Sequence, residues 1–199
     1  MTPINIDLPY ARYAGDFRTK HLLDLVLEAH RILGMNDNCL STGAFINCYK
    51  ATGSMPSAIA SAVLTLNGLH APIQQARDVY EYYDEEMINR DILEGRMIAG
   101  FGNAFHKDSI DPVWLSVQQY MISEFFEEYR RLMDLQDWVN HIRRKYKPDA
   151  KDIFINPAMW TAVVCGMYNF DRGSELSLFI MARLPTWVEK GISYGIKES

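Results

Sequence analysis

The stretch GRMIAGFGNAFHKDSIDP, residues 95–112, carries most of the information about the fold. Gly100 and Gly102 bracket a single aromatic residue, and polar side chains follow them. Glycine permits backbone angles that side chains forbid, and it lets the backbone come close to a neighbour. Because helical patterns lie on both sides, the stretch is predicted to be a loop that approaches a ligand. The alternative is a tight turn that only joins two helices.

Helical periodicity extends outward from this loop toward both ends of the chain. Glycine and proline mark where the predicted helices stop and start, as at Gly34, Gly53 and Pro72. No useful length of sequence alternates between polar and apolar residues, so the predicted class is all-α. The expected helices cover residues 19–33, a segment around 45–50, 57–69, 72–96 and 111–148 with one break. The final region gives two apolar helices, 156–170 and 173–195, the second capped at Ser174 and interrupted near Pro185.

Composition and charge exclude several classes of protein. The net charge of −5 argues against a general nucleic-acid surface, which needs clustered Lys and Arg. The three cysteines form no CxxC pair, which predicts a reduced, cytoplasmic setting without a disulfide framework or zinc site. The N-terminus shows no signal-peptide pattern, and no apolar run reaches membrane-spanning length. We therefore expect a soluble protein with no nucleic-acid or membrane partner.

The histidines separate into two groups by their surroundings. His21 and His141 lie among charged residues and are predicted to be solvated, and His30 lies on an apolar helix and is predicted to be a core residue. His70 and His106 lie beside glycines in predicted loops, which carry functional residues more often than packed elements do. No HxH or HExxH spacing occurs, so no metal site is predicted.

Three ordered segments resemble the citrate synthase superfamily, in particular its short branch of citryl-CoA lyases. These are STGAFINCYKATGSMPSAIASAVLTLNGLH at 41–70, IAGFGNAFHKDSIDP at 98–112 and FIMARLPTW at 179–187. The family motifs are a GPLHGG-like turn, GFGHxxxKxxDPR and xxRxxGW. The resemblance runs from about His30 to Trp187 and implies a divergent, truncated member. It implies a large-lobe helical core, residues 1–71 with 153–199, and a small lobe, residues 72–152.

The resemblance implies carbon–carbon bond chemistry at a coenzyme A thioester, with no bound cofactor. In such enzymes an aspartate removes a proton next to the thioester carbonyl, and a histidine hydrogen-bonds the enolate oxygen. His70 matches that histidine, and Arg183 matches an arginine that binds the carboxylate of the oxoacid. The resemblance also implies a homodimer. The remaining implied site residues are Asn103 and His106, as catalytic groups, and Gly100, Gly102 and Lys107, as substrate-binding groups.

Several family residues are replaced in this chain. Asn103 stands where the family has its second histidine, and an amide cannot transfer a proton near neutral pH. Val113 replaces an arginine, and Ile155 stands in the position of the catalytic aspartate. Two hypotheses therefore stay open. The chain is either a carbon–carbon lyase or synthase with altered catalytic residues, or a catalytically inactive binding or assembly module.

Overall fold

The computed structural model describes residues 17–66, 72–103, 109–173 and 175–197. In these ranges the chain forms nine α-helices and one short 3₁₀ helix. Their only strand-like feature is an isolated antiparallel bridge between Phe101 and Ile155. The predicted all-α class is therefore confirmed.

The first three helices begin and end where glycine, serine and proline permit. They are α1 (Phe17–Gly34), α2 (Leu40–Thr52) and α3 (Met55–Leu64). Gly53 ends α2 in the left-handed conformation, with φ of 62°, and its N–H donates to the Tyr49 carbonyl. The Ser54 hydroxyl then accepts a hydrogen bond from the Ser57 N–H and caps α3.

The predicted helix over residues 72–96 is wrong, because the chain forms two helices there. They are α4 (Ile73–Tyr82) and α5 (Glu85–Leu93). Asp84 lies between them with extended backbone angles, and its carboxylate accepts from the Met87 N–H. Asp84 followed by two glutamates is a strong helix-start signal, since an N-cap carboxylate and acidic first-turn residues satisfy free amides and oppose the helix dipole. The segment is rich in charged residues throughout, so these acidic residues were not distinguished as the start of a second helix.

The single break expected within residues 111–148 is present. A 3₁₀ turn (η2, Pro112–Trp114) leads into α6 (Leu115–Glu124), and α7 (Phe126–Tyr146) follows. Phe125 separates the two helices with non-helical angles, φ −137° and ψ 50°. The chain turns here, and α6 packs against α7 as well as α1.

The last two helices are α8 (Pro157–Met167) and α9 (Glu175–Lys197). The interruption predicted near Pro185 does not occur, since α9 continues through it. Proline inside a helix costs about 3 kcal/mol. Leu178 before it and Trp187 after it are both fully buried, so packing of α9 on its neighbours offsets that cost.

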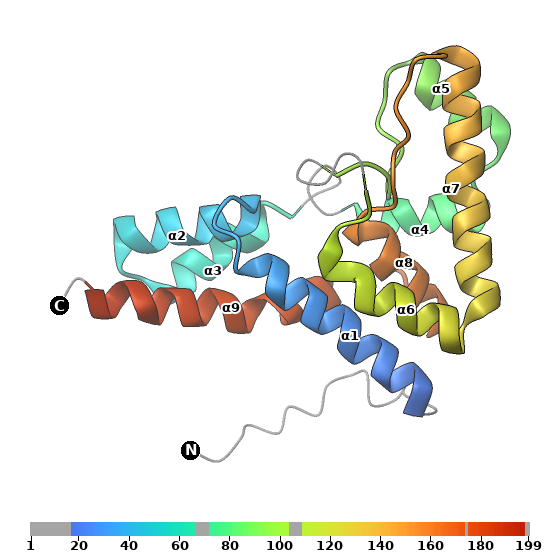
Figure 1. The fold of residues 1–199 in the computed structure, drawn as a ribbon. Helices are drawn as coiled ribbons and strands as arrows, with labels where there is room; N and C mark the ends of the chain where they lie inside the picture. Colours follow the sequence, from blue (N-terminus) through green and yellow to red (C-terminus); the bar gives the residue numbers. More distant parts are fainter. Residues whose placement is uncertain (1–16, 67–71, 104–108, 174, 198–199) are drawn as a thin grey trace.

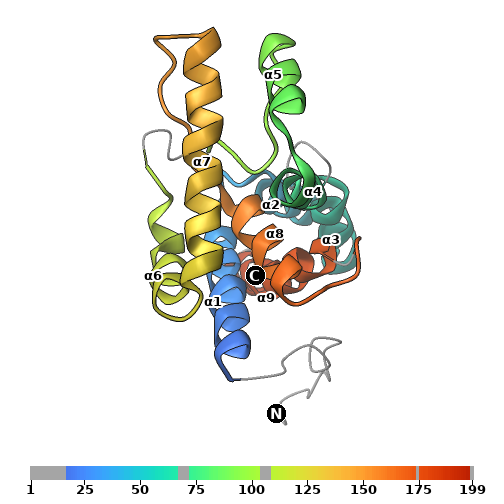
Figure 2. The same ribbon diagram turned by 90° about the vertical axis from the view of Figure 1, so that its right-hand side faces the viewer.

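Helix α8 forms the centre of the molecule, because all its residues from Ala158 to Cys165 are buried. Helices α1, α4 and α9 pack around it. In Figure 1, α9 runs beneath α2 and α3 toward the left edge of the molecule. Figure 2 shows α5 and the upper part of α7 standing side by side above the other helices. The division into two lobes stays a prediction.

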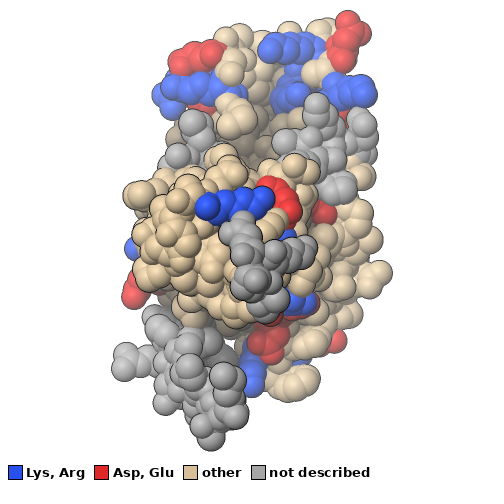
Figure 3. Space-filling model, turned by 90° about the vertical axis from the view of Figure 1, so that its left-hand side faces the viewer, with Lys and Arg blue, Asp and Glu red and all other residues tan. Residues whose placement is uncertain are grey.

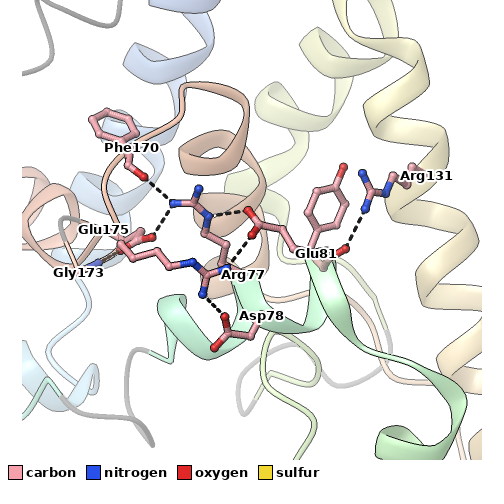
Figure 4. Close-up of polar contacts among 9 residues, drawn as sticks. Arg77, Asp78, Glu81, Arg131, Phe170, Gly173 and Glu175 are labelled. Atoms are coloured by element: carbon pink, nitrogen blue, oxygen red, sulfur yellow. Dashed lines mark hydrogen bonds and ion pairs between the residues drawn. The ribbon is translucent and has the colours of Figure 1, made fainter.

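A network of charged residues joins α4 to the connection between α8 and α9 (Figure 4). The Arg77 guanidinium donates to Glu81 at 2.7 Å, to Glu175 at 2.8 Å and to the Phe170 carbonyl at 2.7 Å. Arg77 and Glu175 are both buried. Arg172 extends the network at the surface, where it pairs with Asp78 and Glu81.

Candidate functional site

The glycine loop is held against the start of α8 by backbone hydrogen bonds. The Gly102 N–H donates to the Phe154 carbonyl at 2.8 Å, and the Asn156 N–H donates to the Gly100 carbonyl at 2.9 Å. The Asn156 side chain donates to the Gly102 carbonyl at 3.0 Å, while its oxygen caps α8. Phe101 between the glycines is buried. The loop is therefore part of a packed unit with residues 154–156.

The two glycines have different surroundings although both have positive φ angles, 88° at Gly100 and 78° at Gly102. A Cβ at Gly100 would lie 2.5 Å from the Met159 Cε and 3.1 Å from the Ala76 Cβ. A Cβ at Gly102 would meet no described atom within 4 Å. The close approach at Gly100 is therefore to α4 and α8, whereas no described atom crowds Gly102.

We expect Gly100→Ala to lower the free energy of unfolding by about 1–3 kcal/mol more than Gly102→Ala. Both substitutions place a side chain at positive φ, so this strain is common to the pair. Only the first also forces a methyl group into Met159 and Ala76. Urea unfolding of the two variants measures the difference, and equal losses would contradict the assigned contacts.

Asn103 lies at the end of the described loop and is half-buried. Its amide nitrogen lies 3.4 Å from the Asp111 Oδ2, a long hydrogen bond. Asp111 is 3% exposed, and its Oδ1 accepts from the Val113 N–H at 3.1 Å. Asn103 and the buried Asp111 carboxylate thus lie beside each other. The predicted site residues His70, His106 and Lys107 lie outside the described residues.

The position that matches the family aspartate carries no ionisable group. Ile155 is 2% exposed, and its N–H donates to the Gln136 side chain at 3.0 Å. Asp152 is half-exposed and pairs with Arg144 at the surface. Asn156 is committed to capping α8 and holding the glycine loop. None of these three residues supplies a carboxylate at the start of α8.

Arg183 is a buried cation without a carboxylate partner in the described part of the chain. It is 3% exposed, and one terminal nitrogen donates to the Cys39 sulfur at 3.3 Å. The guanidinium carbon lies 4.8 Å from the centre of the Phe179 ring, and the Nε atom has no described hydrogen-bond partner. Burial lowers the pKa of Arg183, and Cys39 acts in the opposite direction.

The position of Arg183 depends on Gly34 at the end of α1. A Cβ at Gly34 would lie 2.9 Å from the Arg183 Cδ and 3.4 Å from the Thr186 Cβ. Glycine therefore both ends the helix, as the sequence predicts, and leaves space for the arginine stem. This second role could not be predicted from helix-stop rules.

His30 is fully buried, as predicted for a core histidine, and its ring packs against Phe179 and Trp114. Its Nε2 lies 2.7 Å from the Thr161 hydroxyl, which itself donates to the Pro157 carbonyl. Because that hydroxyl has only one hydrogen, the His30 Nε2 carries the proton and Nδ1 is an acceptor. Nδ1 has no described partner. Burial, and then the charge of Arg183, hold the pKa of His30 well below 6.5.

We expect the stability of the protein to fall with acidification below pH 6.5, partly through His30. The folded-state pKa of His30 is depressed, so the unfolded chain binds the extra proton first. Stability from the neutral ring is thus fully present above pH 6.5 and is lost as the pH falls. Urea unfolding from about pH 7.5 to pH 5 should show a weaker pH dependence in His30→Gln. The exposed-residue control His141→Gln should match the wild type, and an unchanged slope in His30→Gln would refute the assignment.

Sequence reasoning missed Cys39, which contacts Arg183 from the residue before α2. No pattern in the sequence marks this contact, because the two residues are 144 positions apart.

In the described part of the chain, no helix combines the length and hydropathy needed to cross a bilayer.

Comparison with known proteins identifies the fold. No family model and no curated protein matches the chain. Among solved structures, citryl-CoA lyase from Hydrogenobacter thermophilus matches with a TM-score of 0.72 at 16% sequence identity. The match covers 94% of this chain and 76% of that protein. The chain therefore has the citrate synthase-like all-α fold of citryl-CoA lyase, as the sequence resemblance predicts.

Proposed function

We propose that the protein forms or cleaves a carbon–carbon bond in an acyl-CoA or related thioester, with an oxoacid as the second substrate. The observation that carries this proposal is the burial of Arg183 without a carboxylate among the described residues. A buried guanidinium that faces a thiol and no carboxylate is costly to the fold. A substrate carboxylate, bound through the two-pronged geometry of arginine, would supply the missing anion.

The proposed reaction needs a donor for the enolate oxygen and a group that moves the proton. His70 is proposed as the enolate-side donor, which stabilises charge that develops only in the transition state. Asn103 orients the substrate through its amide, and His106 is the replacement acid or base. Gly102 and Lys107 are the proposed substrate-binding groups of this stretch. Gly100 supports the same loop from its packed side.

A catalytically inactive binding or assembly module is the second candidate. Ile155 favours it, because a buried aliphatic side chain at that position cannot remove a proton. Such a module would still bind a carboxylate through Arg183. Both candidates therefore predict that a carboxylate binds at Arg183, and only the enzyme predicts that the thioester is consumed.

The deciding experiment incubates the protein with acetyl-CoA or citryl-CoA plus an oxoacid and follows thioester consumption by mass spectrometry. Turnover that is lost in His70→Gln and reduced in Asn103→Ala supports the enzyme. His21→Gln and His141→Gln change exposed histidines and serve as controls. Binding without turnover identifies the inactive module, and the absence of both binding and turnover refutes the proposed function. We expect Asn103→Ala to weaken binding by about 1–3 kcal/mol.

The proposed homodimer would use the outer face of α3. Residues 40–64 contain one charged side chain, Lys50. Figure 3 shows that this side of the molecule is mostly tan, with a blue and a red side chain near its centre. Ala58 and Ala62 are buried toward α2, so their small side chains serve packing within the chain. Ser57, Ala60 and Leu64 are exposed on the other side of α3.

We expect a dimer by light scattering at micromolar concentration, since isologous two-fold interfaces are the commonest protein symmetry. Leu64 is 82% exposed on the proposed interface. Leu64→Glu should therefore shift the measured mass to that of a monomer, because it would bury a glutamate charge from each subunit between the two α3 faces. Leu93→Glu, on α5 at a position 67% exposed, is the matched control. A monomeric wild type, or a dimer unaffected by Leu64→Glu, would contradict the prediction.

A further inference from the structure

Cys39 occupies the N-cap position of α2 with extended backbone angles, φ −65° and ψ 128°. Its thiol is half-buried and takes part in no disulfide. The preceding residues, Met35 to Asn38, are all exposed. A small reagent can therefore reach this end of α2 from solvent.

Two groups at this site favour the negatively charged form of the thiol. A terminal nitrogen of Arg183 lies 3.3 Å from the Cys39 sulfur. The arginine is only 3% exposed to solvent. The free amides at the start of α2 carry the positive end of the helix dipole. Thiols beside a cation or at a helix N-terminus ionise more readily, and the thiolate is the reactive form.

The Arg183 Nε atom adds an independent observation, because it is buried and has no described hydrogen-bond partner. The guanidinium thus has spare donor capacity and no described carboxylate beside Cys39. An oxygen atom added to the sulfur would enter the reach of a strong donor. Arginine forms short, charge-assisted bonds to oxygen more readily than to sulfur.

We propose that Cys39 is a peroxide-sensitive modification site whose thiolate is stabilised by Arg183. The thiolate sulfur attacks one oxygen of hydrogen peroxide, a sulfur–oxygen bond forms and the oxygen–oxygen bond breaks. The leaving hydroxide takes a proton from solvent and becomes water. Sulfur loses two electrons and becomes a sulfenic acid, and the peroxide gains them.

The modification is reversible by a small thiol. One thiol displaces water from the sulfenic acid to form a mixed disulfide, and a second thiol releases Cys39 and forms the small-molecule disulfide. A further consequence rests on the proposed function. Because the sulfenic oxygen and a substrate carboxylate would compete for the same guanidinium, oxidation would turn off carboxylate binding at Arg183.

Reactivity is tested first on the whole protein without any substrate. Limiting iodoacetamide is added at pH 7, and the labelled fraction of each cysteine is followed by peptide mass spectrometry. Cys48 is the matched control, since it is also half-buried and lies within α2, the helix that Cys39 precedes. We expect Cys39 to react at least about tenfold faster than Cys48, because an ordinary thiol is only a few per cent ionised at pH 7. Equal rates for the two would overturn the proposal.

The buried Cys165 provides an internal baseline. Burial, and then Glu175, raise the pKa of its thiol to about 12, so it should remain unlabelled while the protein is folded. In Arg183→Met the rate at Cys39 should fall toward that of Cys48, and Arg183→Lys should retain part of the difference. An unchanged Cys39 rate in a folded Arg183→Met, with Cys165 still protected, would overturn the role of Arg183.

Oxidation and carboxylate binding are tested in separate arms. After hydrogen peroxide treatment, dimedone should label Cys39 and leave Cys48 unlabelled; no Cys39 adduct would overturn the modification site. Citrate should slow labelling of Cys39 if a carboxylate occupies Arg183. Fast labelling that citrate does not change supports the modification site and counts against the proposed function. If Cys39 is labelled slowly but citrate still binds, the modification site is refuted and the carboxylate-binding role of Arg183 is supported.

Discussion

Replacing Arg77 by methionine is expected to lower the free energy of unfolding by about 3–5 kcal/mol. Arg77 is the described partner of Glu175, whose side chain is only 1% exposed (Figure 4). Removing the guanidinium leaves that carboxylate buried without its cation, and the Phe170 carbonyl loses its donor as well. Desolvation of an unpaired charge outweighs the apolar packing that methionine adds. Urea unfolding at neutral pH measures the loss.

Two further variants test this explanation. Glu175→Gln in the Arg77→Met background should restore part of the stability, because an amide carries no charge to leave unpaired. Arg172→Met removes a partly exposed arginine of the same network and should cost less than about 1 kcal/mol. If Arg77→Met and Arg172→Met cost the same, the buried pair is not the stabilising element.

The same substitution at Arg183 should leave the free energy of unfolding unchanged or raise it. Arg183 is as buried as Arg77, yet its described polar partner is the Cys39 sulfur and no carboxylate. Methionine removes a buried charge that faces no described carboxylate and preserves most of the apolar volume, and the Cys39 thiol can take the neutral form once the cation is gone. Affinity for citrate should nevertheless fall by about 2–5 kcal/mol, since the anion loses its cation. Unfolding in urea and calorimetric titration with citrate measure the two effects.

Stability and binding move in opposite directions only if Arg183 is a ligand-binding residue. Residues that serve binding commonly lower the stability of the free protein, and replacing them commonly raises it. Arg183→Lys should retain part of the affinity, because it keeps the charge and loses the planar fork. A loss of stability in Arg183→Met as large as that in Arg77→Met would assign Arg183 to the structural framework. The proposed function would then lose its main support.

Local chemistry in the sequence determined where most helices begin and end. Gly34 and Gly53 end helices at the expected places, because backbone freedom acts over a few residues. The one break expected within residues 111–148 is present, but the sequence did not place it at Phe125. The all-α class follows from the same short-range patterns, whereas the citrate synthase-like fold was implied by the resemblance of the three quoted segments to that superfamily. The start of α5 at Asp84 was also readable from its capping residues.

Only the tertiary structure decided how each buried group is paired. Helix rules end α9 at Pro185, but packing on both sides of the proline carries the helix through. The sequence shows Arg77 and Arg183 as two arginines on helices. Folding places buried glutamate beside the first and a thiol beside the second. The partners lie 98 and 144 residues away, and electrostatic and hydrogen-bond energies depend on distances of a few ångströms that short-range patterns do not encode.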